Sequence, residues 1–126
     1  MVGIVIVSHS SKLADGVLDA TKIMADGCQI ATAGGTDDNE YGTSYMKIRN
    51  AIESVYSSEG VVVLVDMGSA VMTAEMVIED LGYDNVLLLD CPIAEGAIAA
   101  SVSSLCGDSL EIVMQQALSA KSEAKW

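Results

Sequence analysis

Basic residues are scarce in this sequence, and their scarcity excludes one large class of partners. The 126 residues include six Lys and Arg against 18 Asp and Glu, which gives a formal net charge of −12. Binding to nucleic acid needs clustered Lys and Arg that displace the counterions of the phosphate backbone. The six basic residues are dispersed along the chain and form no cluster. We therefore expect neither a nucleic-acid partner nor attachment to an anionic membrane surface.

Long hydrophobic runs are missing as well. Hydrophobic residues make up 51% of the chain, yet no apolar run approaches the roughly 18 residues that predict a membrane span. The apolar run at residues 2–7 is too short for the core of a signal peptide, and no basic residues lead into it. We therefore expect a cytoplasmic protein. The excess of apolar residues beyond a core points to a subunit interface.

The patterns of metal sites and nucleotide-binding loops are also absent. The chain has three cysteines without a CxxC pair, and a single histidine, His9. An odd number of cysteines without a signal peptide predicts reduced, buried thiols. There is no HExxH pair, and no GxxxxGK[ST] loop that would cradle the phosphates of a nucleotide. We expect no metal and no cofactor, and any phosphoryl group that the chain handles must be delivered by another protein.

Apolar runs alternate with helical segments along the chain. Four short runs, rich in β-branched residues or leucine, predict strands at residues 2–7, 28–33, 61–66 and 86–91. Segments with helical periodicity lie between them, and two more follow Pro92. This alternation predicts an α/β fold with a four-stranded parallel sheet in the order 2-1-3-4 and helices on both faces. We expect one domain over residues 1–118 and a polar tail over residues 119–126.

Helical spacing also predicts which side chains of each helix face the core. The expected sets are Leu13, Val17, Ala20 and Met24 in the first helix, Tyr45, Ile48, Ile52 and Val55 in the second, Ala70, Ala74, Val77, Ile78 and Leu81 in the third, and Leu110, Val113, Met114, Ala117 and Leu118 in the last. The last helix is expected to begin at Asp108 and Glu111, which have the spacing of a capping box.

His9 lies where the predicted sheet order reverses direction. In the order 2-1-3-4 this reversal falls between strands 1 and 3, and ligands of such sheets bind there, beyond the carboxyl ends of the strands. Residues 8–11 and 66–69 both occupy this place. Neutral imidazole is a good nucleophile near neutral pH, and the free amides of a helix start favour an anion. We expect His9 Nε2 to accept a phosphoryl group, held by the backbone amides of Ser10 and Ser11.

Asp66 ends the third apolar run and is expected to act with His9. Its carboxylate would accept a hydrogen bond from His9 Nδ1–H, leave Nε2 as the nucleophile and stabilise the positive ring after transfer. The alternative is that Asp66 only caps a helix. Gly68 and Ser69 follow it, and they would offer a phosphate a close backbone approach and a hydroxyl group.

The loop after the second run carries further candidates. Gly42, Thr43 and Ser44 stand before the second helix, where capping alone is one explanation of their presence. If this loop folds over the point where the sheet order reverses, Thr43 and Ser44 become phosphate contacts. Such a site suits a phosphocarrier and not a kinase.

These segments together resemble a known family. Val-Ser-His-Ser-Ser after the first strand and Asp-Met-Gly-Ser-Ala after the third are similar to the mannose-type EIIA domains of the sugar phosphotransferase system. Gly42-Thr43-Ser44 and the stretch at residues 91–97 favour the branch that serves the bacterial dihydroxyacetone kinase. The resemblance covers about residues 1–118, and its four pieces stand in the right order.

The resemblance implies a reaction and partners. It implies a homodimeric phosphotransferase subunit whose His9 is phosphorylated by the histidine-containing phosphocarrier protein HPr. The phosphoryl group would then pass to ADP on the nucleotide-binding subunit of the kinase, while a second kinase subunit binds dihydroxyacetone. In this family picture Asp66 orients His9, and Ser69 and the loop around Thr43 hold the phosphate.

Three other functions stay open on the sequence. A mannose-type EIIA that feeds a sugar permease uses the same chemistry with a different acceptor. A small tetrapyrrole metal chelatase can also end its first strand near a histidine in a loop of small residues, although such enzymes generally use a second histidine, which this chain lacks. The third is a regulatory module in which phosphorylated His9 only signals.

Overall fold

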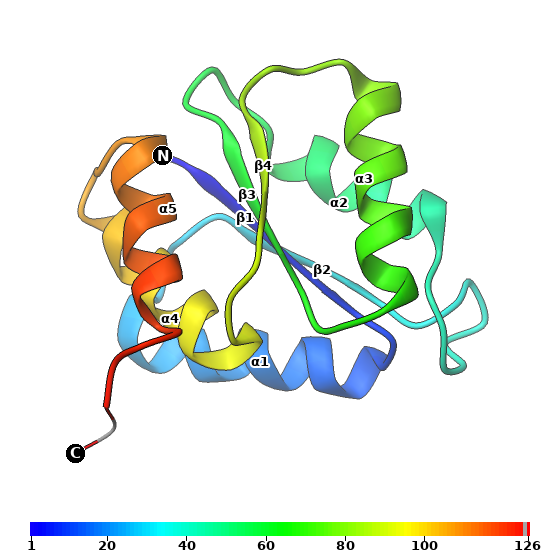
Figure 1. Cartoon of the computed structure of the whole chain (residues 1–126), viewed down its shortest axis with the longest axis horizontal. Coiled ribbons are helices and arrows are strands. Elements are labelled where there is room, and N and C mark those ends of the chain that lie inside the picture. The colour runs from blue at the N-terminus through cyan, green and yellow to red at the C-terminus, as the bar shows by residue number, and fades with distance from the viewer. Residues whose placement is uncertain (125) are drawn as a thin grey trace.

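A computed structural model describes residues 1–124 and 126 of the chain. Within them, strands and helices alternate up to the last strand, and two helices follow it (Figure 1). The strands are β1 (Gly3–Ser8), β2 (Ile30–Gly34), β3 (Val61–Val65) and β4 (Val86–Leu89). The helices are α1 (Ser11–Ala25), α2 (Tyr45–Val55), α3 (Ser69–Leu81), α4 (Ile93–Leu105) and α5 (Leu110–Ser119). None of these helices is long and apolar enough to cross a membrane.

The strands form one parallel sheet in the order β2-β1-β3-β4, which confirms the predicted topology. Central strands β1 and β3 pair with each other, and β1 also pairs with β2. The register places Ser8 opposite Gly34 and Val7 opposite Val65. The residues that follow β1 and β3 are therefore brought together at the carboxyl edge of the sheet.

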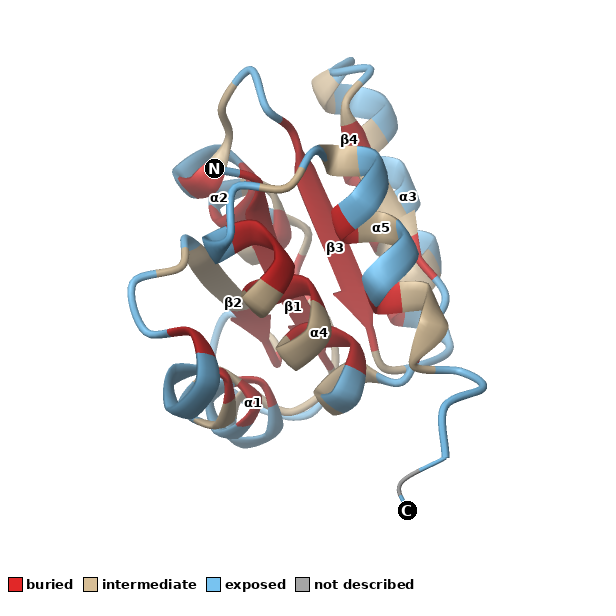
Figure 2. Cartoon of the chain, turned by 90° about the vertical axis from the view of Figure 1, so that its left-hand side faces the viewer, coloured by how far each residue is buried: buried red, intermediate tan, exposed pale blue. Residues whose placement is uncertain are grey.

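Two hydrophobic cores lie on opposite faces of the sheet. Successive residues of a strand point to opposite faces, and Ile4 and Ile6 pack with α1, α4 and α5 while Val5 and Val7 pack with α2 and α3. Figure 2 shows the buried sheet between these layers, with the exposed surfaces of the helices facing outward. Both faces of the sheet are covered, which explains why the strands are continuous apolar runs.

The predicted core faces are confirmed for three helices; for α1 the prediction is right for Val17 and wrong for Leu13 and Met24. In α2, α3 and α5 the expected side chains are buried or pack against the buried clusters. In α1 the buried set is Ala14, Val17, Thr21 and Ala25, whereas Leu13 is 45% exposed and Met24 is 64% exposed. The buried face of α1 carries smaller side chains than expected because the helix lies very close to β2. A Cβ atom on Gly34 would meet Ser11 Cα at 2.6 Å and Ala14 Cβ at 3.0 Å, so only small side chains fit there.

Serine side chains begin three of the helices. Ser10, Ser44 and Ser109 accept hydrogen bonds from backbone amides in the first turns of α1, α2 and α5. The expected start of the last helix at Asp108 is therefore wrong by one residue. Asp108 instead accepts a hydrogen bond from the Ser103 hydroxyl at 2.7 Å.

The three cysteines are unpaired, but they are not uniformly buried as expected. Cys91 is buried, Cys28 is half-buried and Cys106 is exposed. Cys106 is exposed because it caps the C-terminus of α4, where the chain leaves the packed face of the helix. Burial raises the pKa of the Cys91 thiol to about 11, with the neighbouring Asp90 charge adding to the shift.

Candidate functional site

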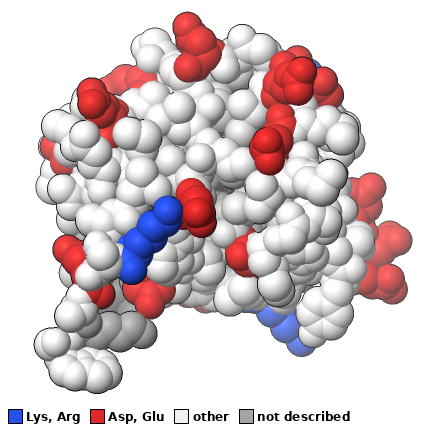
Figure 3. All heavy atoms as spheres, viewed as in Figure 1, with Lys and Arg blue, Asp and Glu red and all other residues white. Residues whose placement is uncertain are grey.

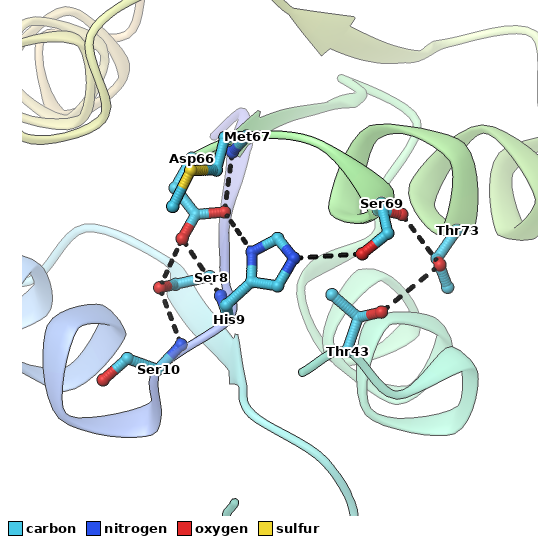
Figure 4. A network of polar contacts seen from close by, with 8 residues as sticks. All are labelled: Ser8, His9, Ser10, Thr43, Asp66, Met67, Ser69 and Thr73. Atoms are coloured by element: carbon cyan, nitrogen blue, oxygen red, sulfur yellow. Dashed lines mark hydrogen bonds and ion pairs between the residues drawn. The ribbon is translucent and has the colours of Figure 1, made fainter. Parts of the chain in front are cut away.

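The polar residues at the ends of β1 and β3 form one connected group. Asp66 directly follows β3, and its backbone amide donates to the Val7 carbonyl of β1 at 3.2 Å. This continuation of the strand pairing places Asp66 beside Ser8 and His9 (Figure 4). The two segments that the sequence analysis assigned to this edge of the sheet are thus in contact.

His9 and Asp66 meet through their side chains. His9 Nδ1 lies 3.1 Å from Asp66 Oδ1, and the two side chains are 25% and 10% exposed. A carboxylate can only accept a hydrogen bond, so in neutral His9 the proton belongs on Nδ1. Nε2 is then left with its lone pair free, which is the form of imidazole that acts as a nucleophile.

The other ring nitrogen of His9 faces helix α3. Ser69 Oγ lies 3.0 Å from His9 Nε2, and this hydroxyl can donate to the free lone pair. Ser69 is the first residue of α3, and Gly68 before it has φ 56° and ψ −126°. This positive φ favours glycine, and it turns the chain from Asp66 into the start of α3, whose first residue lies beside Nε2.

Four hydrogen bonds converge on the Asp66 carboxylate. Ser8 Oγ and the His9 amide donate to Oδ2 at 2.8 and 3.0 Å, while His9 Nδ1 and the Met67 amide lie 3.1 and 2.7 Å from Oδ1. Burial alone would raise the pKa of Asp66. The hydrogen bonds from the His9 amide, the Ser8 hydroxyl, the His9 ring and the Met67 amide together outweigh burial, and the pKa lies below its usual value. Asp66 is therefore ionised at neutral pH.

The loop between β2 and α2 reaches the same place. The Gly42 amide donates to the His9 carbonyl oxygen at 2.9 Å, which holds the loop against the residue after β1. Thr43 Oγ1 then lies 3.4 Å from Thr73 Oγ1, and Thr73 donates to the Ser69 carbonyl at 3.0 Å. Figure 4 shows Ser69, Thr73 and Thr43 on the Nε2 side of the ring. The loop thus folds over the point where the sheet order reverses.

Three serines from the expected phosphate-binding set have other roles in the geometry. The Ser10 amide donates to Ser8 Oγ at 3.0 Å, and Ser10 lies on the far side of His9 from Ser69 (Figure 4). Ser11 begins α1 and lines a cleft with Ser10 and the exposed Tyr41. Ser44 is buried, caps α2, and its hydroxyl donates to Asp37. Ser10 and Ser44 thus have these partners within the chain, and their expected contact with a phosphate on Nε2 stays a prediction.

The sequence analysis gave no role to two residues of the group, Ser8 and Thr73. Ser8 carries a hydroxyl at the end of an apolar strand, and an isolated polar residue in such a run was the available signal. Thr73 stands four residues after Ser69, so both lie on one face of α3. Helical spacing from Ser69 could have identified it.

Acidic side chains dominate the charge of the molecule. On the face seen in Figure 3, Asp and Glu are spread widely, and Lys and Arg are few. In the described part of the chain, no three His, Cys, Asp or Glu side chains gather closely enough to hold a metal ion. Asp66 differs from most of these acids because it is largely buried and hydrogen-bonded at both oxygens.

Comparison with family models identifies the family of the chain. The EIIA-man model, described as the PTS system fructose IIA component, matches residues 3–114. The match includes both segments that form the site, residues 8–11 and 66–69.

Curated relatives share a name and differ in length. The "PEP-dependent dihydroxyacetone kinase, phosphoryl donor subunit DhaM" of Escherichia coli (strain K12) is 43% identical over 95% of this chain. This chain spans 27% of the length of that relative. The "PEP-dependent dihydroxyacetone kinase 2, phosphoryl donor subunit DhaM" of Listeria innocua is 34% identical, and the match covers 92% of this chain and 96% of the relative. The second relative is therefore matched along almost its whole length.

Solved structures share the fold. A crystal structure of EF1359, a protein of unknown function, matches with a TM-score of 0.86 and 27% identity, over 100% of this chain and 99% of that one. The phosphotransferase system component EIIA from Streptococcus agalactiae matches with a TM-score of 0.71 and 17% identity, over 96% of this chain and 92% of that one. The fold of this chain is thus shared with these proteins.

Proposed function

The chain belongs to the EIIA-man family, and we propose that it is a phosphohistidine carrier of a dihydroxyacetone kinase. His9 takes a phosphoryl group from HPr and passes it to ADP bound on the nucleotide subunit of the kinase. A second kinase subunit binds dihydroxyacetone. The names of the relatives, which are phosphoryl donor subunits of such kinases, support this assignment. We propose that the exchange takes place in the cytoplasm.

One observation carries the proposal: His9 has its two ring nitrogens in opposite environments. Nδ1 lies against the Asp66 carboxylate, and Nε2 faces the hydroxyl of Ser69. The Nε2 lone pair attacks the phosphorus of the phosphohistidine on HPr. A new N–P bond forms while the N–P bond of the donor breaks, and the donor ring keeps the electron pair. His9 then carries a positive ring, which the ionised Asp66 stabilises at 3.1 Å.

Groups on the Nε2 side hold the phosphoryl oxygens. Phosphoryl transfer passes through a loose transition state, so positioning and hydrogen-bond donors matter more than covalent help. Ser69 donates its hydroxyl, Thr43 adds a second one from the loop after β2, and Gly68 allows close approach to the amides of α3. Gly42 contributes by holding this loop to the His9 carbonyl. In the second half-reaction a β-phosphate oxygen of ADP attacks the same phosphorus, and the electron pair of the N–P bond returns to Nε2.

We also propose that the chain forms a homodimer through α3 and the turn before it. Met67, Met72 and Met76 are 65%, 73% and 56% exposed. Methionine side chains adapt well to an apolar partner surface. Light scattering at micromolar concentration is expected to give twice the mass of the chain, and a monomer would contradict the dimer.

The test of the carrier function is phosphorylation by enzyme I, HPr and phosphoenolpyruvate, followed by mass spectrometry. The wild-type chain is expected to gain one acid-labile, base-stable phosphate, and His9→Ala is expected to gain none. Because His9 is the only histidine in the chain, this single variant removes every possible phosphohistidine. A wild-type chain that gains no phosphate contradicts the proposal.

A second step separates the possible acceptors. The phosphorylated chain is mixed with the ADP-bound kinase subunits and dihydroxyacetone. Loss of phosphate from His9 with formation of dihydroxyacetone phosphate supports the kinase. Stable phospho-His9 in this mixture would instead point to a sugar permease component or a signalling module as the acceptor.

A further inference from the structure

We propose that Ser8 is a positioning residue for His9, acting through the Asp66 carboxylate. The inference rests on the proposed phosphotransfer at His9 and adds a residue to it. Ser8 does not reach the reacting nitrogen. It fixes the carboxylate that decides which nitrogen of His9 carries the proton.

The hydrogen bonds of Ser8 have only one possible direction. Its hydroxyl lies 2.8 Å from Asp66 Oδ2 and 3.0 Å from the backbone nitrogen of Ser10. An amide can only donate and a carboxylate can only accept, so the single hydroxyl proton points at Asp66. Ser8 is 0% exposed, and water therefore does not compete for either bond.

This bond holds one side of the carboxylate while the other side holds the ring. Oδ2 accepts from Ser8 and the His9 amide, and Oδ1 accepts from the Met67 amide and faces His9 Nδ1. Without the Ser8 hydroxyl, Oδ2 keeps one donor, and the carboxylate is held less firmly against rotation about its Cβ–Cγ bond. The contact between Oδ1 and Nδ1 then weakens. In the neutral ring, the tautomer protonated on Nδ1 is therefore less strongly favoured over the tautomer protonated on Nε2.

The type of partner distinguishes Ser8 from the other serines that are 0% exposed. Ser101 donates to the Ala97 carbonyl at 2.6 Å and Ser104 donates to the Val2 carbonyl at 2.5 Å. Both bonds are to backbone oxygens, as is usual for a serine in a packed core. Ser8 donates to a charged side chain that contacts His9, so its hydroxyl bond is the charge-assisted one.

The experiment compares Ser8→Ala, Ser8→Thr and the control Ser101→Ala in the full chain. Ser101→Ala removes an equally buried hydroxyl from α4 without touching the site. The first measurement is the ¹⁵N spectrum of the His9 ring, which reports the fraction of neutral ring with its proton on Nδ1. The second is the rate of His9 phosphorylation by phosphorylated HPr, and the third is the thermal midpoint of unfolding. The ring signals need no assignment because the chain has one histidine.

Ser8→Ala is expected to lower the Nδ1-protonated fraction and to slow phosphorylation about tenfold, as removal of groups that orient a histidine typically does. Ser8→Thr keeps the hydroxyl and is expected to restore both values. Ser101→Ala is expected to change only the thermal midpoint. If Ser8→Ala does not fold, Ser8→Cys replaces it, since a thiol is a much weaker donor.

Three results overturn the role of Ser8. One is a Ser8→Ala protein with the wild-type ring spectrum and the wild-type rate. Another is a loss of rate that Ser101→Ala reproduces without a change in the ring spectrum, because this describes a structural effect. The last is a stably folded Ser8→Thr that is as slow as Ser8→Ala. Failure of the carrier proposal gives a different result, because the wild-type chain then takes up no phosphate. The ring spectra of wild type and Ser8→Ala still test the role of Ser8 in that case.

Discussion

Replacement of Asp66 by asparagine tests the centre of the site. All four groups around the carboxylate are hydrogen-bond donors: the Ser8 hydroxyl, the His9 amide, the His9 ring and the Met67 amide. An asparagine has the same shape, but its NH₂ group cannot accept. Either orientation of the amide therefore sets NH₂ against two donors. With NH₂ toward the ring, His9 moves its proton to Nε2 and loses its nucleophile.

The charge contributes a second and larger effect on the phosphorylated state. Nδ1 and Oδ1 are 3.1 Å apart. Because each charge is spread over two atoms, we take about 4 Å as the effective distance between the two charges. At an effective dielectric constant of about 20 the attraction is then about 4 kcal/mol. This corresponds to an equilibrium shift of about 10³-fold away from phospho-His9. The transition state carries part of that charge, and we expect the rate of phosphorylation to fall about 10²-fold.

The assay measures the rate and the equilibrium of His9 phosphorylation with phosphorylated HPr as donor. The initial rate and the final ratio of phosphorylated chain to phosphorylated HPr are measured for wild type, Asp66→Asn and the control Asp90→Asn. Asp90 is 99% exposed and pairs with Lys121, so its replacement removes a charge without touching the site. If Asp66→Asn keeps rate and ratio close to those of the control, Asp66 does not stabilise the ring and the reasoning is wrong.

Three further predictions follow from the same geometry. Ser69→Ala removes the hydroxyl 3.0 Å from Nε2, and it should slow phosphorylation about tenfold without moving the Nδ1 proton in the ¹⁵N spectrum; a shifted spectrum would contradict separate roles for the two nitrogens. Because hydrogen bonds lower the pKa of Asp66 in the folded chain, its contribution to stability is present above the unfolded pKa of about 3.9 and is lost as the pH falls through the folded value. Urea unfolding at about pH 5 and about pH 3 should therefore show a greater loss in wild type than in Asp66→Asn, and equal losses would refute this linkage. Gly34→Ala places a Cβ atom 2.6 Å from Ser11 Cα and 2.8 Å from the Ser10 carbonyl oxygen, and thermal unfolding should show a loss of about 2 kcal/mol; an unchanged midpoint would show that α1 has room to move.

The sheet could be predicted from the sequence because each strand is buried on both faces. A run such as Val61–Val65 has no polar residue to disturb its pattern, and alternation with helices then leaves few topologies. Parallel strands end at one edge, so His9 and Asp66 could be placed together from the sequence alone. Hydroxyl groups were harder to assign. Ser10 and Ser69 both stand at helix starts, and only the packing of α1 and α3 decides which of them faces Nε2.

The core face of α1 and the position of the β2–α2 loop depend on tertiary contacts. Hydrophobicity favours Leu13 and Met24, but the close approach of Gly34 to Ser11 and Ala14 leaves room only for small side chains at that point of α1. The loop is held against the residues after β1 by contacts such as the hydrogen bond from the Gly42 amide to the His9 carbonyl. Neither contact has a local signal in the sequence, because each joins residues far apart in the chain.

The opposite environments of the two His9 nitrogens also impose an order on the exchange. In the proposed exchange Asp66 covers Nδ1, so Nε2 alone must serve both the protein that gives the phosphoryl group and the protein that takes it. The two cannot form a ternary complex around His9, and each must leave before the other binds. Steady-state kinetics should then be ping-pong, with parallel lines in double-reciprocal plots. An excess of unphosphorylated HPr should compete with the kinase subunit, and the carrier would slow when its supply of phosphate runs low.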